Sequence, residues 1–199
     1  MFDIIHFIQI VGVAGICAIV FLESGIIFGF FLPGDSLLFT AGLLASQGFL
    51  SITILFVFCS IFAIAGDSAG YWTGKNMGRA LFEKEAGFFF KKKRLHQAET
   101  FYQKHGKYTI ILARFIPIIR TFAPIVAGVA RMDYKTFLSY NIIGGILWAV
   151  SVLSLGYFLG NIIPNPDRYI LPIIIAIVFI SLLPVIISFV RNYFARKNM

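Results

Sequence analysis

The chain has 199 residues, of which 59% are hydrophobic and 13% are charged, and its mean hydropathy is +0.87. A soluble domain carries about 25% charged residues, so this composition excludes a soluble globular protein and indicates a single integral membrane domain over residues 1–199. The formal net charge of +8 does not indicate nucleic-acid binding, because the basic residues gather in one segment without any module that reads nucleic acid.

The first half of the chain predicts two membrane helices separated by a break. Residues 4–31 and about 49–72 are long apolar segments, each sufficient for a transmembrane helix. Between them, Pro33 and Gly34 are predicted to break the helix. The apolar piece that follows, to residue 44, is too short to span a bilayer alone. We therefore predict a re-entrant hairpin over residues 32–44.

The middle of the chain is polar and basic. Residues 75–107 hold nine of the 17 Lys and Arg residues, interspersed with aromatic side chains. Such a segment beside a membrane span is typical of a cytoplasmic loop, and its mixed composition favours amphipathic helices on the membrane surface.

The second half of the chain resembles the first. Residues 108–130 are apolar but contain Pro117 and Pro124, which are predicted as further helix breaks. We predict a second re-entrant hairpin over residues 114–130. Residues 136–160 and 169–190 carry no charge and predict two more transmembrane helices. The tail is basic, so it and residues 75–107 are predicted to be cytoplasmic. Counting spans back from the basic segment places the N-terminus in the cytoplasm as well.

An internal repeat supports this organisation. Ala41-Gly42 recurs as Ala127-Gly128, and the pattern Gly-Tyr-x-x-Gly occurs at residues 70–74 and again at 156–160. Both pairs are separated by 86 residues, since 128 − 42 and 156 − 70 give the same value. The predicted fold is an all-α membrane protein with two inverted repeats, residues 23–74 and 108–160, plus an additional N-terminal and C-terminal transmembrane helix. Inverted repeats with broken helices are typical of transporters.

Five ionisable residues fall in apolar surroundings, where each costs roughly 2.5–3.5 kcal/mol at the bilayer centre: Glu23, Asp35, Asp67, Arg114 and Arg120. One interpretation is that they form salt bridges that hold the hairpins in place. The functional interpretation is a polar cavity, in which the arginines bind phosphate through their two-pronged guanidinium groups and the carboxylates carry protons. Asp67 lies near the end of its span, where an interfacial position is an alternative.

These residues and their surroundings resemble the DedA family, the bacterial branch of proteins with a SNARE-associated or VTT domain. The resemblance extends from about Glu23 to Gly160. Its marks are the acidic motif E-S-G-I-I-F-G-F-F-L-P-G-D, the arginine motif R-F-I-P-I-I-R-T-F-A-P-I-V-A-G, and the downstream residues Met132, Phe137, Asn141 and Trp148. Asp35 stands where many members have Glu.

The resemblance implies a lipid translocase, or flippase, of the bacterial inner membrane. It implies transport of undecaprenyl phosphate or a phospholipid such as phosphatidylethanolamine, driven by the proton motive force. It also implies that this transport requires the residues matching Glu23, Asp35, Arg114 and Arg120. We assign phosphate binding to Arg114 and Arg120 and proton coupling to Glu23 and Asp35. The expected partners are membrane lipid and protons, and self-association stays open.

Other function classes remain open from the residues alone. A small-ion transporter or proton antiporter would use the same charges. A membrane lipid phosphatase is disfavoured, because such chemistry usually needs a histidine or a metal cluster. None of His6, His96 and His105 lies beside Arg114 or Arg120 in the sequence. An assembly factor without transport of its own is a further alternative. We expect no enzyme activity, no cofactor and no metal, since no Cys/His cluster occurs.

Overall fold

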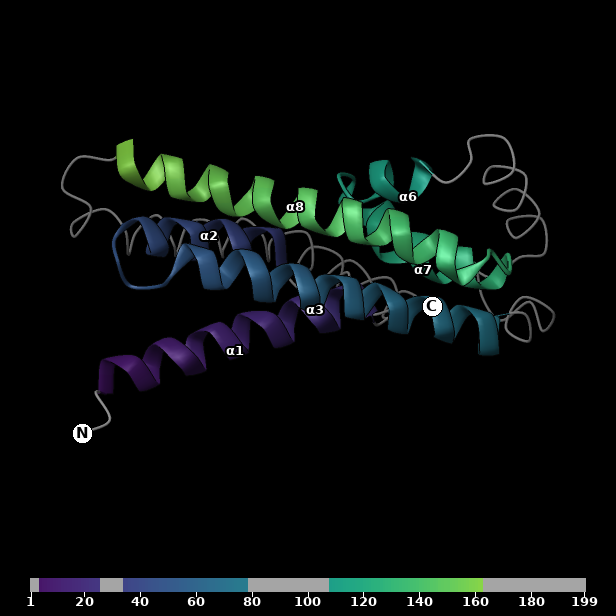
Figure 1. Cartoon of the computed structure of the whole chain (residues 1–199), viewed down its shortest axis with the longest axis horizontal. Helices are drawn as coiled ribbons and strands as arrows, with labels where there is room; N and C mark the ends of the chain where they lie inside the picture. The colour runs from purple at the N-terminus through teal and green to yellow at the C-terminus, as the bar shows by residue number, and fades with distance from the viewer. Residues whose placement is uncertain (1–3, 26–33, 79–107, 163–199) are drawn as a thin grey trace, which may run out of the picture.

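The computed structural model describes residues 4–25, 34–78 and 108–162, and every element in these ranges is a helix (Figure 1). The predicted break at Pro33, most of the basic segment, the C-terminal helix at 169–190 and the tail lie outside the described residues. The described helices are α1 (Ile4–Gly25), α2 (Gly34–Ser46), α3 (Ile52–Thr73), the π-helical turn η2 (Gly74–Gly78), α6 (Tyr108–Ala113), α7 (Pro117–Val129) and α8 (Tyr134–Ile162).

Two long helices form the axis of the molecule. In the described part of the chain, two segments are long and apolar enough to cross a membrane, Ile52–Asn76 and Tyr134–Ile162. They run antiparallel along the length of the bundle (Figure 1), with Trp72 against Tyr134 at one end, their ring centroids 5.4 Å apart. Large apolar side chains such as Phe58, Ile61 and Ile146 remain exposed on them, as expected for helices solvated by lipid.

Two short helices lie alongside the long ones. α2 and α7 have 13 residues each, which at 1.5 Å per residue gives about 20 Å, less than the roughly 30 Å of a hydrocarbon core. α2 runs parallel to α8 and α7 runs parallel to α3, so the two short helices point toward opposite ends of the bundle. Their first turns meet near its middle, where Arg120 contacts Asp35.

Glycines allow these helices to approach backbone to backbone. A Cβ atom at Gly42 would overlap the carbonyl oxygen of Leu153, and one at Gly156 would overlap that of Phe39. Likewise, a Cβ at Gly128 would overlap the carbonyl of Tyr71, and one at Gly74 would overlap that of Ile125. Small residues at such crossings are typical of helix pairs in membranes.

The glycines at these crossings are those of the sequence repeat. The short helix of the first half packs on α8 of the second half, and the short helix of the second half packs on α3 and η2 of the first. In both halves, therefore, glycines of the repeated Ala-Gly and Gly-Tyr-x-x-Gly patterns allow the backbone of a short helix to contact the backbone of a long one.

α1 runs parallel to α3, which bears on the predicted topology. Gly12 lies beside Leu50, and Gly25 lies beside Gly66. α1 therefore starts at the end of the bundle where α3 starts (Figure 1), away from η2. The sequence predicted the N-terminus and the basic segment on the same side because it treated residues 4–31 as one complete crossing. In the structure α1 ends at Gly25, beside the first turn of α2.

Of the two predicted helix breaks in the second half, the structure has one at Pro117 and none at Pro124. α2 begins at Gly34 and α7 begins at Pro117, after a turn at residues 114–116 that separates it from α6. Pro124, predicted to break the helix, instead lies inside α7. A proline there removes one backbone hydrogen bond, and helices within a membrane bundle tolerate this because neighbouring helices support the backbone.

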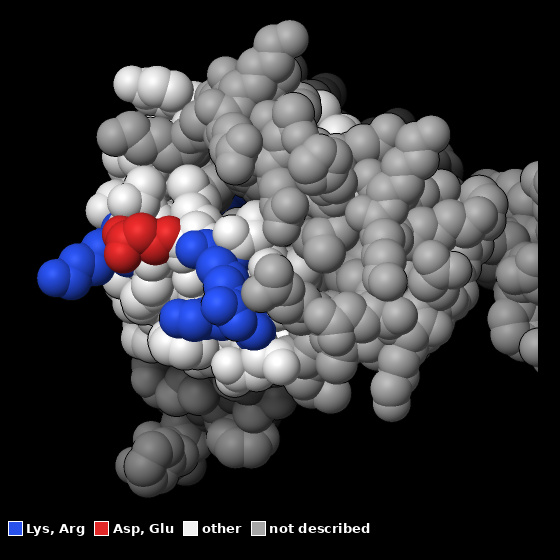
Figure 2. Space-filling view, turned by 90° about the vertical axis from the view of Figure 1, so that its right-hand side faces the viewer, with Lys and Arg blue, Asp and Glu red and all other residues white. Residues whose placement is uncertain are grey.

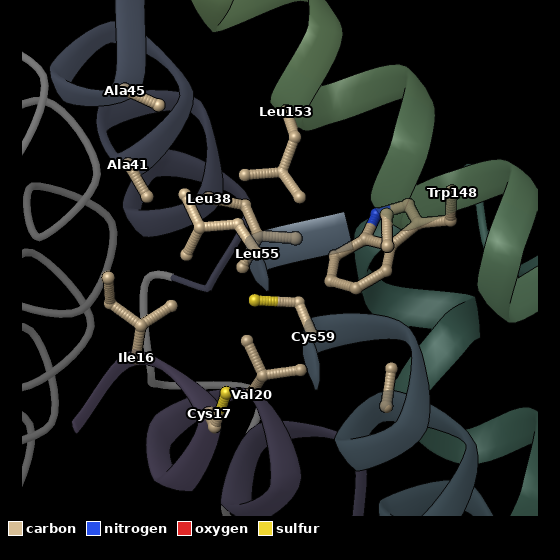
Figure 3. Close-up of a cluster of buried hydrophobic side chains, with 12 residues drawn as sticks. Ile16, Cys17, Val20, Leu38, Ala41, Ala45, Leu55, Cys59, Trp148 and Leu153 are labelled. Atoms are coloured by element: carbon tan, nitrogen blue, oxygen red, sulfur yellow. The ribbon is translucent and has the colours of Figure 1, made fainter. Parts of the chain in front are cut away.

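The apolar core sits where α1, α2, α3 and α8 meet (Figure 3). Leu38, Leu55 and Leu153 are completely buried there. Cys17 and Cys59 are buried free cysteines in the same cluster, consistent with thiols that act as small apolar side chains.

The exposed charges of the described residues gather at one end of the bundle. Lys75, Arg131, Asp133 and Lys135 are the exposed charged side chains in the described ranges, and Figure 2 shows basic side chains beside one acidic group on that end. Asp133 caps α8 by accepting hydrogen bonds from the Thr136 backbone N–H at 2.9 Å and from its hydroxyl, which holds the pKa of that carboxyl below its usual value. The bundle thus has one charged, mainly basic end.

Candidate functional site

Arg120 lies between two carboxylates near the middle of the bundle. Its Nη1 donates to Asp35 Oδ1 at 2.6 Å, and its Nη2 donates to Glu23 Oε1. The side chains of Arg120 and Glu23 are only 2% and 6% exposed, whereas that of Asp35 is 39% exposed. We call these three residues the Arg120 triad. The structure therefore brings together three of the four residues that the sequence selected as functional.

Each member of the triad comes from the end of a helix. Glu23 is in the last turn of α1, Asp35 in the first turn of α2 and Arg120 in the first turn of α7. Carboxylates are stabilised near helix N-termini by the unpaired backbone N–H groups, which suits Asp35. Arg120 gains nothing from its helix and depends on the carboxylates for its burial.

Trp148 of α8 completes the site. Its indole Nε1 donates to Asp35 Oδ1 at 2.8 Å, the same oxygen that Arg120 contacts. Its ring centroid lies 4.5 Å from the Cζ atom of Arg120, within the range of a cation–π interaction. Trp148 therefore positions both partners of the Arg120–Asp35 pair.

Gly34 fixes the position of Glu23. A Cβ atom at Gly34 would overlap the Glu23 carboxylate, so only glycine lets that carboxylate pass so close to the start of α2. Glu23 Oε2 and Arg120 Nε are buried without a hydrogen-bond partner among the described residues. Buried polar atoms of this kind are uncommon, and they leave the triad with unused hydrogen-bonding capacity.

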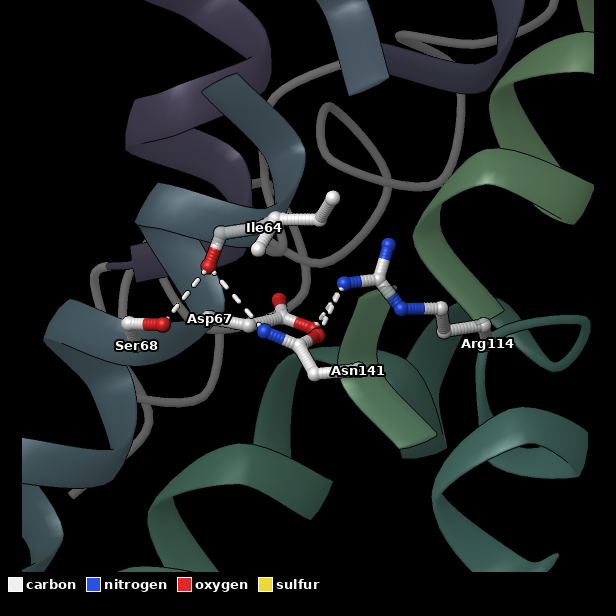
Figure 4. Close-up of polar contacts among 5 residues, drawn as sticks. All are labelled: Ile64, Asp67, Ser68, Arg114 and Asn141. Atoms are coloured by element: carbon white, nitrogen blue, oxygen red, sulfur yellow. Dashed lines mark hydrogen bonds and ion pairs between the residues drawn. The ribbon is translucent and has the colours of Figure 1, made fainter. Parts of the chain in front are cut away.

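A second buried cluster surrounds Arg114. Its Nη2 donates to Asp67 Oδ2 and to Asn141 Oδ1, and the amide of Asn141 donates at 3.0 Å to the carbonyl of Ile64 (Figure 4). Asp67 is 1% exposed and Arg114 is 3% exposed. The exposed, interfacial position considered for Asp67 is therefore excluded, because the carboxylate is needed inside to balance Arg114.

One face of α8 serves both clusters. Asn141, Gly144, Gly145 and Trp148 follow the i, i+3, i+4, i+7 spacing of a single helix face. Gly144 and Gly145 lie against the Arg114 side chain and leave room for it. The sequence analysis named Asn141 and Trp148 only as marks of the family resemblance and did not assign them to the site. Polar and aromatic side chains at this spacing in an uncharged helix are nevertheless a detectable sign of a helix face that contacts buried charges.

The two clusters form one electrostatic system. Asp67 interacts with Arg120 as well as with Arg114, and Arg114 interacts with Arg120. Within the described ranges, three carboxylates face two guanidinium groups, so their full ionisation leaves one negative charge. Among the described residues, no group of three or more His, Cys, Asp or Glu side chains is placed to hold a metal ion.

Long apolar helices, short helices that meet at mid-bundle and buried paired charges define a polytopic helical membrane protein with a polar centre. Comparison with known proteins gives the family. The model of the VTT domain matches residues 32–158. The chain is 44% identical over 176 residues to Protein DedA of Escherichia coli K12, covering 87% of this chain and 80% of that protein. The chain belongs to the DedA family of VTT-domain membrane proteins, which confirms the resemblance noted in the sequence.

Two further relatives extend this comparison. An uncharacterized membrane protein of Mycobacterium tuberculosis H37Rv is 47% identical over 186 residues, covering 92% of this chain and 81% of the relative. The inner membrane protein YqjA of Escherichia coli K12 is 30% identical over 143 residues, covering 72% and 65%. No solved structure matches the chain.

Proposed function

We propose that this protein is a lipid translocase that moves undecaprenyl phosphate or a glycerophospholipid such as phosphatidylethanolamine between membrane leaflets, in dependence on the proton gradient. The phosphate binds to Arg120, with Arg114 as the second cationic group. Glu23 and Asp35 exchange protons as the site changes sides. The protein acts in the bacterial inner membrane, and it is a carrier and not an enzyme.

One observation carries this proposal: a buried arginine, held by two carboxylates, lies where the first turns of two short helices meet. Helix N-termini favour anions through their free N–H groups and their dipole, and a guanidinium group binds phosphate with two parallel hydrogen bonds. In transporters, broken helices commonly meet in this way at the substrate site.

The proposed architecture follows from helix lengths. α2 and α7 are re-entrant half-helices, each entering from one side, because about 20 Å of helix does not cross the hydrocarbon core. The charged end formed by Lys75, Arg131 and Lys135 faces the cytoplasm, together with residues 79–107 and the C-terminal tail. The start of α1 then lies on the opposite side.

Proton coupling is supported by the charge balance. With three carboxylates and two guanidinium groups, the centre is neutral only when one carboxylate holds a proton, and an unbalanced charge in the membrane is costly. This excess carboxylate also favours a second candidate, a proton-coupled antiporter of small ions.

Reconstitution in liposomes tests the proposal. We expect purified protein to speed the transfer of phosphatidylethanolamine or undecaprenyl phosphate between leaflets, and an imposed proton gradient to increase the rate. Arg120→Lys keeps the charge but loses the two-pronged fork, so the rate is expected to fall at least about tenfold, which corresponds to roughly 1.4 kcal/mol. The control is Arg131→Lys, at an exposed arginine of the charged end, with an unchanged rate.

Two outcomes would count against the proposal. Full lipid transfer by folded Arg120→Lys and Glu23→Gln variants would reduce the buried charges to a scaffold. Proton-coupled movement of small ions, without lipid transfer by the wild type, would favour the antiporter.

A further inference from the structure

The two carboxylates of the Arg120 triad differ in their freedom to move. Glu23 is 5% exposed as a residue and lies against Gly34 at the start of α2. The side chain of Asp35 is 39% exposed. Its contacts on the buried side are Arg120 Nη1 and Trp148 Nε1, both to the same oxygen, Oδ1. Asp35 is therefore the ligand of Arg120 that can leave without dismantling the core.

Both terminal nitrogens of Arg120 already donate to carboxylates, Nη1 to Asp35 and Nη2 to Glu23. An anion that takes the two-pronged contact with these nitrogens displaces a carboxylate, and the more exposed of the two is Asp35. The position of the Asp35 carboxylate, against a guanidinium N–H, an indole N–H and the first turn of α2, is also the position that suits a phosphate oxygen.

We propose that Asp35 is an internal ligand that occupies the phosphate position of the empty site, and that it takes up one proton when an anionic headgroup displaces it from Arg120. This rests on the proposed function, since the site is the same, and it gives different roles to the two acids: Asp35 exchanges, whereas Glu23 stays bound to Arg120.

The charges around Asp35 require the proton. α1 brings Glu23, α3 brings Asp67, α7 brings Arg120, the turn before α7 brings Arg114, and α8 contributes the neutral Trp148. The centre already has one carboxylate in excess. A bound anion would raise that excess to two negative charges if Asp35 stayed ionised.

Protonation of Asp35 by water on the open side restores the charge balance of the empty site. The carboxylate becomes a neutral carboxylic acid, which no longer competes with the anion for Arg120. The proton returns to water when the anion leaves and Asp35 binds Arg120 again. Anion binding and proton uptake are therefore linked one to one, and the linkage needs no movement of the helices.

Trp148 provides a direct measurement of this exchange. The chain has two tryptophans, Trp72 and Trp148, so a Trp72→Phe protein reports the site through the fluorescence of Trp148 alone. The probes are dihexanoylphosphatidylglycerol in detergent and free dimethyl phosphate. Both are phosphodiesters whose single charge does not change between about pH 5 and 9, so any pH dependence belongs to the protein. Comparing them separates recognition of a lipid from recognition of the free anion.

We expect the apparent Kd of the Trp72→Phe protein to rise about tenfold per pH unit wherever one proton is taken up with each anion bound. In Asp35→Asn this slope disappears, and the Kd at pH 8 falls at least tenfold because no carboxylate competes. In Glu23→Gln the slope remains. Independently, adding the phosphodiester to wild-type protein in weak buffer takes up one proton per anion bound, a measurement that needs no variant.

The outcomes separate this inference from the proposed function. A pH slope that persists in Asp35→Asn, or weaker binding by that variant, would overturn the exchange. So would anion binding by wild-type protein without proton uptake, although the lipid site itself would then stand. If the wild type binds neither phosphodiester at any pH, the proposed phosphate site fails and the exchange fails with it.

Discussion

Arg114 shows how a buried charge depends on a single neighbour. Its guanidinium has one carboxylate partner, Asp67, and one neutral partner, Asn141. Arg120, by contrast, has two carboxylates. Removing one partner of a buried ion pair leaves an uncompensated charge, which costs far more than the net value of the pair. Asp67 is therefore expected to contribute to stability through Arg114.

Asp67→Ala is expected to lower the free energy of unfolding by about 3–5 kcal/mol. The double variant Asp67→Ala with Arg114→Leu is expected to be less destabilised than the single one, because no buried charge is left alone. The measurement is thermal unfolding in detergent micelles. Ser68→Ala is the matched control, since Ser68 is the next residue in α3 and bonds only to the carbonyl of Ile64. A loss as small as that of the control would mean that Arg114 finds another partner.

At the residue scale, the sequence identified the buried charges but not their pairing. Glu23, Asp35, Arg114 and Arg120 stand out because charge is expensive in an apolar segment. Their distribution into two clusters depends on which helix faces which, and no sequence spacing gives that. From the sequence, an interfacial position was an alternative for Asp67, because the residue lies near the end of its apolar segment and the sequence does not show which side chains surround it. Its partner Arg114 lies 47 residues away.

At the scale of elements, the glycines set the spacing between helices. Gly156 lies where the backbone of α8 touches the backbone of α2, whereas Gly15 on α1 has nothing within 4 Å of its would-be Cβ. The sequence repeat pointed to these glycines through their common offset. It could not show that each short helix packs on the long helix of the other half, because a repeat describes similarity and not contact.

Gly156→Ala is expected to destabilise the protein by about 1–3 kcal/mol, as overpacking does in a tight interface, because the carbonyl of Phe39 is backbone and cannot turn aside. Gly128→Ala, where a Cβ atom would overlap the backbone carbonyl of Tyr71, is expected to lose a similar amount. Gly15→Ala is the control and is expected to gain up to about 1 kcal/mol from its higher helix propensity. Thermal unfolding of the three purified variants gives the comparison. Equal melting temperatures for Gly156→Ala and Gly15→Ala would contradict the close helix approach.

At the scale of the whole molecule, the parallel course of α1 and α3 decides the topology. Hydropathy along the chain marks apolar segments but not whether each one crosses, so residues 4–31 were counted as a full span. In the structure α1 ends and α2 begins near the middle of the bundle, and α2 then runs back toward the end where α1 begins. The side on which the N-terminus lies relative to the basic segment stays a prediction.

Cysteine labelling tests this topology. In a background with Cys17→Ala and Cys59→Ala, single cysteines are introduced as Lys135→Cys at the charged end and Phe49→Cys between α2 and α3, where both native residues are exposed. The positive-inside tendency places the charged end in the cytoplasm. A membrane-impermeant maleimide is therefore expected to label Phe49→Cys in intact cells, but Lys135→Cys only after the membrane is opened. A cysteine at Phe2→Cys, just before α1, is expected to behave like Phe49→Cys, because α1 and α3 start at the same end. If it is protected in intact cells while Phe49→Cys is labelled, then residues 4–31 cross the membrane after all.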